Sequence, residues 1–257
     1  MIDVKRANVL FIDGKTDKAV EMYYEGALLG DAECAFNYAY CLLRGKGTAK
    51  DAAAAKSFFT YAVNSVPEAA YNLAVMYLDG VGCKKDYKRA MEYMHDAARA
   101  GVIEAQLYLG VAHTVGLVFE PDVEVISKIP YHIPEYRDRS VMLEGEIEEN
   151  PVDEENKLRA VYSDPTSAFE WFRAAARHST DYVEDLARTG KYLYARCFID
   201  GLGTDFNRDR GNALMLLAAK EGSEEAAYYI TTEAPYMLEK LGDSEYIESV
   251  RKIERLG

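Results

Sequence analysis

The chain has 257 residues, of which 49% are hydrophobic and 28% charged. A chain of this length buries roughly three quarters of its unfolded surface, so it needs no disulfide or structural metal to fold. Its formal net charge is −13, which argues against binding to duplex nucleic acid or to an anionic membrane, because both attract positively charged protein. A charged partner, if there is one, is therefore expected to be a basic protein or peptide.

The start of the chain and the cysteines give no sign of export or of metal chemistry. Asp3, Lys5 and Arg6 precede any apolar run, so no secretory signal is expected. No stretch approaches the roughly 18 apolar residues of a membrane helix. The four cysteines include no Cys-x-x-Cys pair. We expect a cytoplasmic protein that holds no metal and no cofactor.

Residues 1–30 are expected to form a helical hairpin that caps the amino-terminal end of the fold. Only the second half of this segment follows the repeat that begins at residue 31, with Ala19, Tyr23 and Gly30 at matching positions.

Residues 31–66 and 67–101 are two copies of one unit, with an offset of about 35 residues. In each copy, apolar residues at helical spacing predict a first helix, and a Gly-x-Gly motif ends it. Asp51 and Asp86 then cap a second helix. The unit is therefore a helical hairpin. The matching pairs are Glu33 and Glu68, Ala35 and Ala70, Asn37 and Asn72, Ala39 and Ala74, and Gly45 and Gly80.

Residues 102–179 are expected to form the next repeat, interrupted by an insertion at 117–163. The insertion holds four of the seven prolines, and its acidic run from Glu144 to Glu155 has seven carboxylates and no basic residue. Two interpretations stay open. The insertion is either a tolerated surface loop, or a flap at 117–140 that folds over a groove or contacts a partner.

Residues 180–222 form the last predicted repeat, with the glycine motif at 200–203, and residues 223–257 are expected to form capping helices at the carboxyl end. The alanine that anchors the second helix recurs as Ala19, Ala55, Ala90 and Ala168, with Gly211 at the same place in the last unit. Residues 1–257 are thus predicted to be a single α-solenoid domain.

The pattern E-A-x-x-x-L-A-x-x-Y-x-x-G-x-G, read here at 68–82 and followed by an aspartate, an alanine, an aromatic pair and A-A-x-x-G, resembles the Sel-one-like repeat family, a relative of the tetratricopeptide repeats. The resemblance covers about 30–115 and 164–230. It implies an all-α fold, a right-handed α-solenoid of about five helical-hairpin repeats with a long loop insertion in the fourth. It also implies a binding scaffold, usually without catalysis of its own.

No catalytic constellation is visible in the sequence. The four histidines show no i, i+4 pair, and His113 occupies a core-facing position. His132, in the insertion, has no acid or nucleophile nearby in the sequence. We therefore expect no enzyme, although a hydrolase with its site under the insertion stays open as a third hypothesis.

First helices line the concave wall in a stack of helical hairpins. Their inward-facing positions are rich in Tyr, Asn and Arg, which are residues that bind peptides at small entropic cost. Packing between neighbouring helices is the alternative role for any one of these tyrosines. The predicted protein-binding residues are Phe36, Asn37, Tyr40, Arg44, Tyr71, Asn72, Tyr108, Tyr192 and Arg196.

The preferred hypothesis is a non-catalytic adaptor that captures a peptide or protein segment on this concave face, with the insertion gating or extending the site. The alternative is an acidic inhibitor or immunity-like protein that neutralises a basic enzyme or masks a nucleic-acid-binding face. No oligomeric state is predicted.

Overall fold

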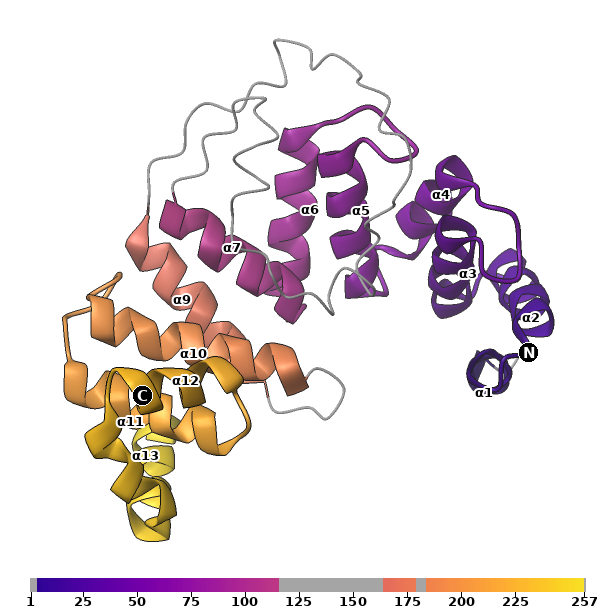
Figure 1. Cartoon of the computed structure of the whole chain (residues 1–257). Helices are drawn as coiled ribbons and strands as arrows, with labels where there is room; N and C mark the ends of the chain where they lie inside the picture. The colour runs from indigo at the N-terminus through magenta and orange to yellow at the C-terminus, as the bar shows by residue number, and fades with distance from the viewer. Residues whose placement is uncertain (1–3, 116–163, 179–183, 257) are drawn as a thin grey trace. The chain divides into compact units, whose positions relative to one another are not determined.

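The structure is a computed structural model that describes residues 4–115, 164–178 and 184–256 (Figure 1). All regular elements in these ranges are helices, and consecutive helices form hairpins, which confirms the predicted all-α fold. The insertion expected at 117–163, with its flap and His132, lies outside the described residues. The helices fall into two compact units, which we describe separately as unit 1 (α1 to α6) and unit 2 (α7 and α9 to α13).

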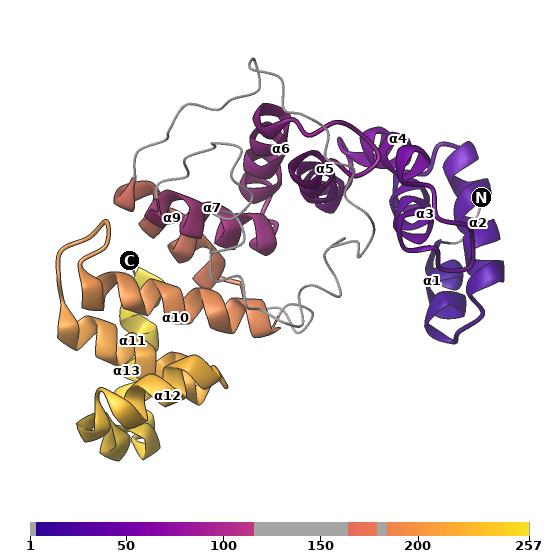
Figure 2. The ribbon, with the colours of Figure 1, turned by 45° about the horizontal axis from the view of Figure 1, so that its top comes forward.

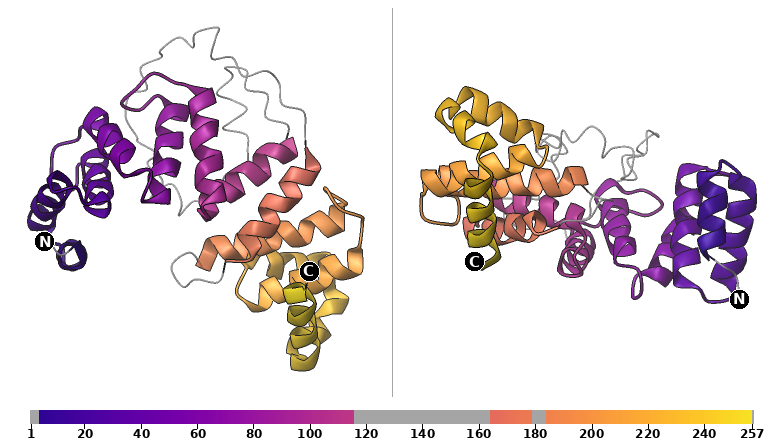
Figure 3. Two further views of the ribbon diagram at one scale, coloured as in Figure 1. Left: turned by 180° about the vertical axis from the view of Figure 1, so that it is seen from behind. Right: turned by 90° about the horizontal axis from the view of Figure 1, so that it is seen from below.

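Unit 1 consists of three hairpins whose first helices are α1, α3 and α5. Helices α1 to α4 lie side by side, each packed on the next, and α5 packs on α6 (Figures 1 and 3). The bounds are α1 (Val4–Ile12), α2 (Thr16–Leu28), α3 (Ala32–Arg44), α4 (Ala52–Ala62), α5 (Pro67–Asp79) and α6 (Tyr87–Arg99).

Aspartate caps and left-handed glycines set the limits of these helices. The carboxylates of Asp51 and Asp86 accept hydrogen bonds from the backbone N–H groups of Ala54 and Arg89, each at 2.9 Å. Gly45 and Gly80 end α3 and α5 with φ of 67° and 73°, a region that favours glycine. Both predicted cap positions and the predicted role of the first glycine in each motif are therefore confirmed.

The second glycine of each Gly-x-Gly motif has a further role, which is to let one hairpin approach the one before it. A Cβ atom on Gly47 would lie 2.9 Å from the carbonyl carbon of Thr16, the first residue of α2. A Cβ atom on Gly82 would lie 2.6 Å from the carbonyl carbon of Ala52, the first residue of α4. Because these neighbours are backbone atoms, any side chain at either position would push the two hairpins apart.

The core of unit 1 combines small residues with a few large ones. Ala39 and Ala74 are fully buried, so neighbouring helices come close together at these positions. Phe59 on α4 is also fully buried and fills the space between α3 and α4. This combination of small and large residues gives the close packing that the repeat needs.

Unit 2 repeats the same hairpin arrangement, with α10 packed between α9 and α11 (Figure 2). A Cβ atom on Gly110 of α7 would lie 2.6 Å from Cδ1 of Phe172 on α9, so this glycine lets the two helices meet closely. The bounds are α7 (Ile103–Val115), α9 (Pro165–Ala176), α10 (Glu184–Asp200), α11 (Arg208–Lys220), α12 (Glu224–Thr232), the 3-10 helix η3 (Pro235–Gly242) and α13 (Ser244–Leu256).

None of the helices in the described ranges has both the length and the apolar composition that crossing a membrane requires.

Candidate protein-interaction surface

The predicted binding residues of α3 form one continuous, half-buried face. Phe36, Asn37, Tyr40 and Arg44 are all partly accessible to solvent, and they recur at three- and four-residue intervals along the helix. Residues three and four positions apart are neighbours on a helix surface. The structure therefore brings together the four α3 residues that the sequence pointed to.

Two of these side chains are held by contacts with neighbouring helices. The ring of Phe36 packs against that of Phe59 on α4, with centroids 5.6 Å apart, so part of Phe36 belongs to the core. The amide nitrogen of Asn37 donates a hydrogen bond to Oδ1 of Asn8 on α1 at 3.2 Å. The hydroxyl of Tyr23 donates to the same oxygen at 2.7 Å. The Asn37 amide is thus positioned by α1 and α2.

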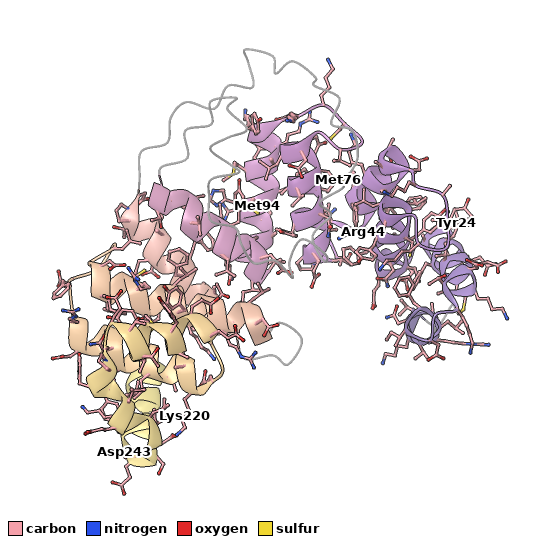
Figure 4. All side chains as sticks on the ribbon, viewed as in Figure 1. Tyr24, Arg44, Met76, Met94, Lys220 and Asp243 are labelled. Carbon is pink, nitrogen blue, oxygen red and sulfur yellow. The ribbon has the colours of Figure 1, made fainter. Side chains whose placement is uncertain are left out.

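The carboxyl end of α3 carries an aromatic ring with two cations close to it. The guanidinium carbon of Arg44, labelled in Figure 4, lies 5.8 Å from the centre of the Tyr40 ring. The ammonium nitrogen of Lys46 lies 5.9 Å from the same centre. Such contacts are worth roughly 0.5–1 kcal/mol at accessible sites. They hold the Tyr40 ring in place and leave a cationic, aromatic end to the surface.

The predicted binding residues of α5 are more buried than those of α3. Tyr71 is 8% exposed and Asn72 is 7% exposed. The amide nitrogen of Asn72 donates to the carbonyl oxygen of Glu68 in its own helix at 2.8 Å. Of the predicted binding residues of unit 1, therefore, the ones accessible to solvent lie on α3.

In unit 2 the predicted residues come from α7 and α10. Tyr108 of α7 is 8% exposed. Tyr192 and Arg196 of α10 are half-buried and lie four residues apart on one face. The guanidinium group of Arg196 donates to both carboxylate oxygens of Asp200, at 2.9 and 3.1 Å. This pair fixes the direction of the arginine on an accessible helix face.

Sequence reasoning missed Asn8 and Lys46. Asn8 lies on α1, where no repeat pattern marks the positions, so the sequence held no signal for it. Lys46 stands between the two glycines of a motif that was interpreted only as a helix end. Its position immediately after Arg44 and Gly45 could have indicated a basic turn.

Burial shifts the pKa values of several titratable groups among the described residues. Burial raises the pKa of the Cys34, Cys41 and Cys197 thiols to about 12, so they stay protonated. Burial lowers the pKa of His113, against the opposing effect of Asp164. Within the ranges that the structure covers, no three His, Cys, Asp or Glu side chains gather in a way that could hold a metal ion.

Comparison with known proteins agrees with the series of helical hairpins described above. The Sel1 repeat pattern matches residues 32–65, 67–102, 158–179 and 189–223. A search of curated proteins finds no match. Among solved structures, a Sel1 repeat protein from Oxalobacter formigenes superposes with a TM-score of 0.60 at 20% sequence identity. The match covers 84% of this chain and 49% of the Oxalobacter chain, so this chain spans about half the length of that protein.

A second solved structure is a protective antigen of uropathogenic Escherichia coli strains that displays an SLR fold. Its TM-score is 0.41 at 15% identity, and the match covers 99% of this chain and 60% of the antigen.

The Sel1 repeat fold generally serves as a protein–protein interaction scaffold, and proteins built from it are typically not catalytic. With four matching repeats and consecutive helical hairpins in both units, the chain belongs to the Sel1 repeat family.

Proposed function

We propose that this protein is a non-catalytic, cytoplasmic adaptor that captures a peptide or protein segment on the first helices of its hairpins. The residues proposed for capture are those of the sequence prediction: Phe36, Asn37, Tyr40, Arg44, Tyr71 and Asn72 in unit 1, and Tyr108, Tyr192 and Arg196 in unit 2. We name the unit 1 set, together with Asn8, the first-helix surface.

The observation that carries the proposal is the accessible face of α3. Its Asn37 amide is held by Asn8, and its Tyr40 ring is held by Arg44 and Lys46. Side chains that are fixed before binding lose little conformational entropy when a partner arrives. An amide also offers a donor and an acceptor to an extended peptide backbone.

The test is capture of binding proteins from a native lysate by the full chain and by two double variants. Asn37→Ala with Tyr40→Ala alters the first-helix surface. Tyr61→Ala with Asn64→Ala is the matched control, because it removes the same two residue types at the same spacing from exposed positions at the end of α4. The first variant is expected to lose the captured protein, and the control is expected to keep it.

Circular dichroism and the thermal midpoint of each variant show whether the fold is intact. The proposal fails if both double variants retain the captured protein, or if both lose it while folded. Tyr71 and Asn72 are less suitable for this test because they are buried, so replacing them changes folding as well as binding.

The alternative of an acidic inhibitor remains a sequence prediction. It requires that binding depend on the carboxylates at 144–155 and weaken strongly with salt. Deletion of those residues, with capture measured at low and high ionic strength, tests it.

A further inference from the structure

One edge of unit 1 is basic, although the net charge of the whole chain is −13. This edge is formed by the turn between α3 and α4, the turn between α5 and α6, and the first turn of α6. We name it the basic edge; its residues are Lys46, Lys50, Lys84, Lys85, Lys88 and Arg89.

The two turns of the basic edge lie next to each other. Gly82, in the second turn, approaches Ala52 so closely that a Cβ atom would lie 2.6 Å from the Ala52 carbonyl carbon. Ala52 begins α4, immediately after the first turn. The cations on the turns of the α3–α4 and α5–α6 hairpins therefore lie on neighbouring parts of the surface.

The ring of Tyr77 on α5 contacts cations from both hairpins, α3–α4 and α5–α6. The ammonium nitrogen of Lys56 on α4 lies 5.5 Å from the centre of the Tyr77 ring on α5. The guanidinium carbon of Arg89 on α6 lies 5.8 Å from the same centre. Tyr77 also stacks on Tyr93 with an interplanar angle of 7°. These contacts bring cations from α4 and α6 to one aromatic ring.

Lys50 and Lys85 occupy the same place in successive repeats. Each lies five residues after the glycine that ends the first helix, Gly45 or Gly80. Each Cγ atom would lie 2.9 Å from a Cβ atom on that glycine, so the aliphatic part of the side chain rests against the turn. At the same place in unit 2, five residues after Gly201, stands Phe206. The paired lysines are therefore a property of unit 1.

The carboxylates of this edge are engaged in the fold. Asp51 and Asp86 cap α4 and α6, and Asp86 also pairs with Arg89, whose Nε lies 3.3 Å from a carboxylate oxygen. Burial raises the pKa of Asp79 to about 6, and the nearby charge of Lys85 opposes this shift. In the described part of the chain, Lys50, Lys84 and Lys88 form no ion pair of 4.0 Å or less.

We propose that the basic edge of unit 1 binds an acidic protein segment, meaning a short run of Asp and Glu residues on a partner. Several accessible cations on adjacent turns can pair with the carboxylates of such a run, and opposite charges raise both the rate and the selectivity of association. The acidic remainder of the molecule is screened beyond about 8 Å at physiological ionic strength. The net charge of −13 disfavours a long nucleic acid, so a short acidic segment is favoured.

This inference goes beyond the proposed capture on the first-helix surface and does not depend on it. The test uses the full chain and a short, fluorescein-labelled polyglutamate peptide, whose binding is followed by fluorescence anisotropy at low and at physiological salt. One variant carries Lys50→Glu, Lys84→Glu and Lys88→Glu. The control carries Arg177→Glu, Arg208→Glu and Lys220→Glu, exposed positions of unit 2 that change the net charge equally.

The edge variant is expected to bind the peptide on the order of tenfold more weakly, whereas the control stays within about twofold of the original chain. In the original chain, addition of the peptide is expected to shift the backbone amide NMR signals of residues 46–50 and 84–89. This second measurement remains decisive if the edge variant does not fold.

Three results would overturn the inference. They are the absence of polyglutamate binding at low salt, equal weakening in the edge variant and the control, and amide shifts confined to other parts of the chain. Tighter binding of an oligothymidylate with the same number of charges would instead assign the edge to a single-stranded nucleic acid. Loss of this binding in an Asn37→Ala variant is not expected, because Asn37 bonds to Asn8 and not to a residue of the basic edge; this separates the test from that of the proposed adaptor function.

Discussion

Replacing Gly82 by alanine tests whether the second glycine of the repeat motif determines how hairpins stack. Gly82 has a φ of 67°, and a Cβ atom there would lie 2.6 Å from the carbonyl carbon of Ala52. Gly82→Ala is therefore expected to lower the free energy of unfolding in two ways. An alanine in the left-handed region costs about 1–2 kcal/mol. Displacing the backbone of α4 from its contact costs about 1–3 kcal/mol more, which is typical of an overpacked site.

Gly14 supplies a matched control for the first of these costs. It has a φ of 76°, and a Cβ atom there would meet no other atom within 4 Å. Gly14→Ala is therefore expected to lose only about 1–2 kcal/mol of the free energy of unfolding. Gly82→Ala is expected to lose about 2–5 kcal/mol in total.

The assay is unfolding by urea, followed by circular dichroism, with amide hydrogen exchange on the native chain as a second measurement. Repeat proteins unfold in parts, so exchange shows which hairpins open. Gly82→Ala is expected to accelerate exchange in α4, α5 and α6. The reasoning is refuted if Gly82→Ala and Gly14→Ala lose the same free energy of unfolding.

Three further predictions concern side chains of the described helices. Burial raises the pKa of Asp79 to about 6, so the folded chain binds this proton more tightly than the unfolded chain and stability falls as the pH rises from about 4 to about 6. Asp79→Asn should therefore raise the free energy of unfolding by about 1–2 kcal/mol at neutral pH and leave it unchanged near pH 4. Asp205→Asn is the exposed control. Asp86→Ala removes the cap of α6 and should cost about 1 kcal/mol in chemical denaturation, whereas Asp96→Ala, which breaks an exposed pair with Arg99, should cost less than about 0.5 kcal/mol. In alkylation of the native chain followed by mass spectrometry, the partly exposed Cys83 should react first, and equal rates at all four thiols would contradict the described burial of Cys34, Cys41 and Cys197.

The hairpins were predictable because their signals are local. Asp51 and Asp86 cap helices through a hydrogen bond that spans three residues, and Gly45 and Gly80 end helices through their own backbone angles. Such geometry depends on the residue and its nearest neighbours along the chain. The sequence alone therefore indicated where these helices begin and end.

The degree of burial along the first helices was not predictable in the same way. Asn37 is half-buried and Asn72 is buried, although both occupy the same place in the repeat. Burial depends on how closely one hairpin approaches the next, and that distance is set by contacts such as Gly82 with Ala52. Asn8 was missed for the related reason that its role arises from contact with α3. The division into two compact units likewise has no signature in the repeat pattern.

The central claim is that partners bind to the first-helix surface, and site-specific photo-crosslinking tests it most directly. A benzophenone amino acid is placed at position 40, on the accessible face of α3, or at position 61, where Tyr61 is exposed on α4. After irradiation in a native lysate, we predict covalent adducts with a partner protein at position 40 and none at position 61. Adducts at position 61 alone, or equal adducts at both positions, would contradict the account.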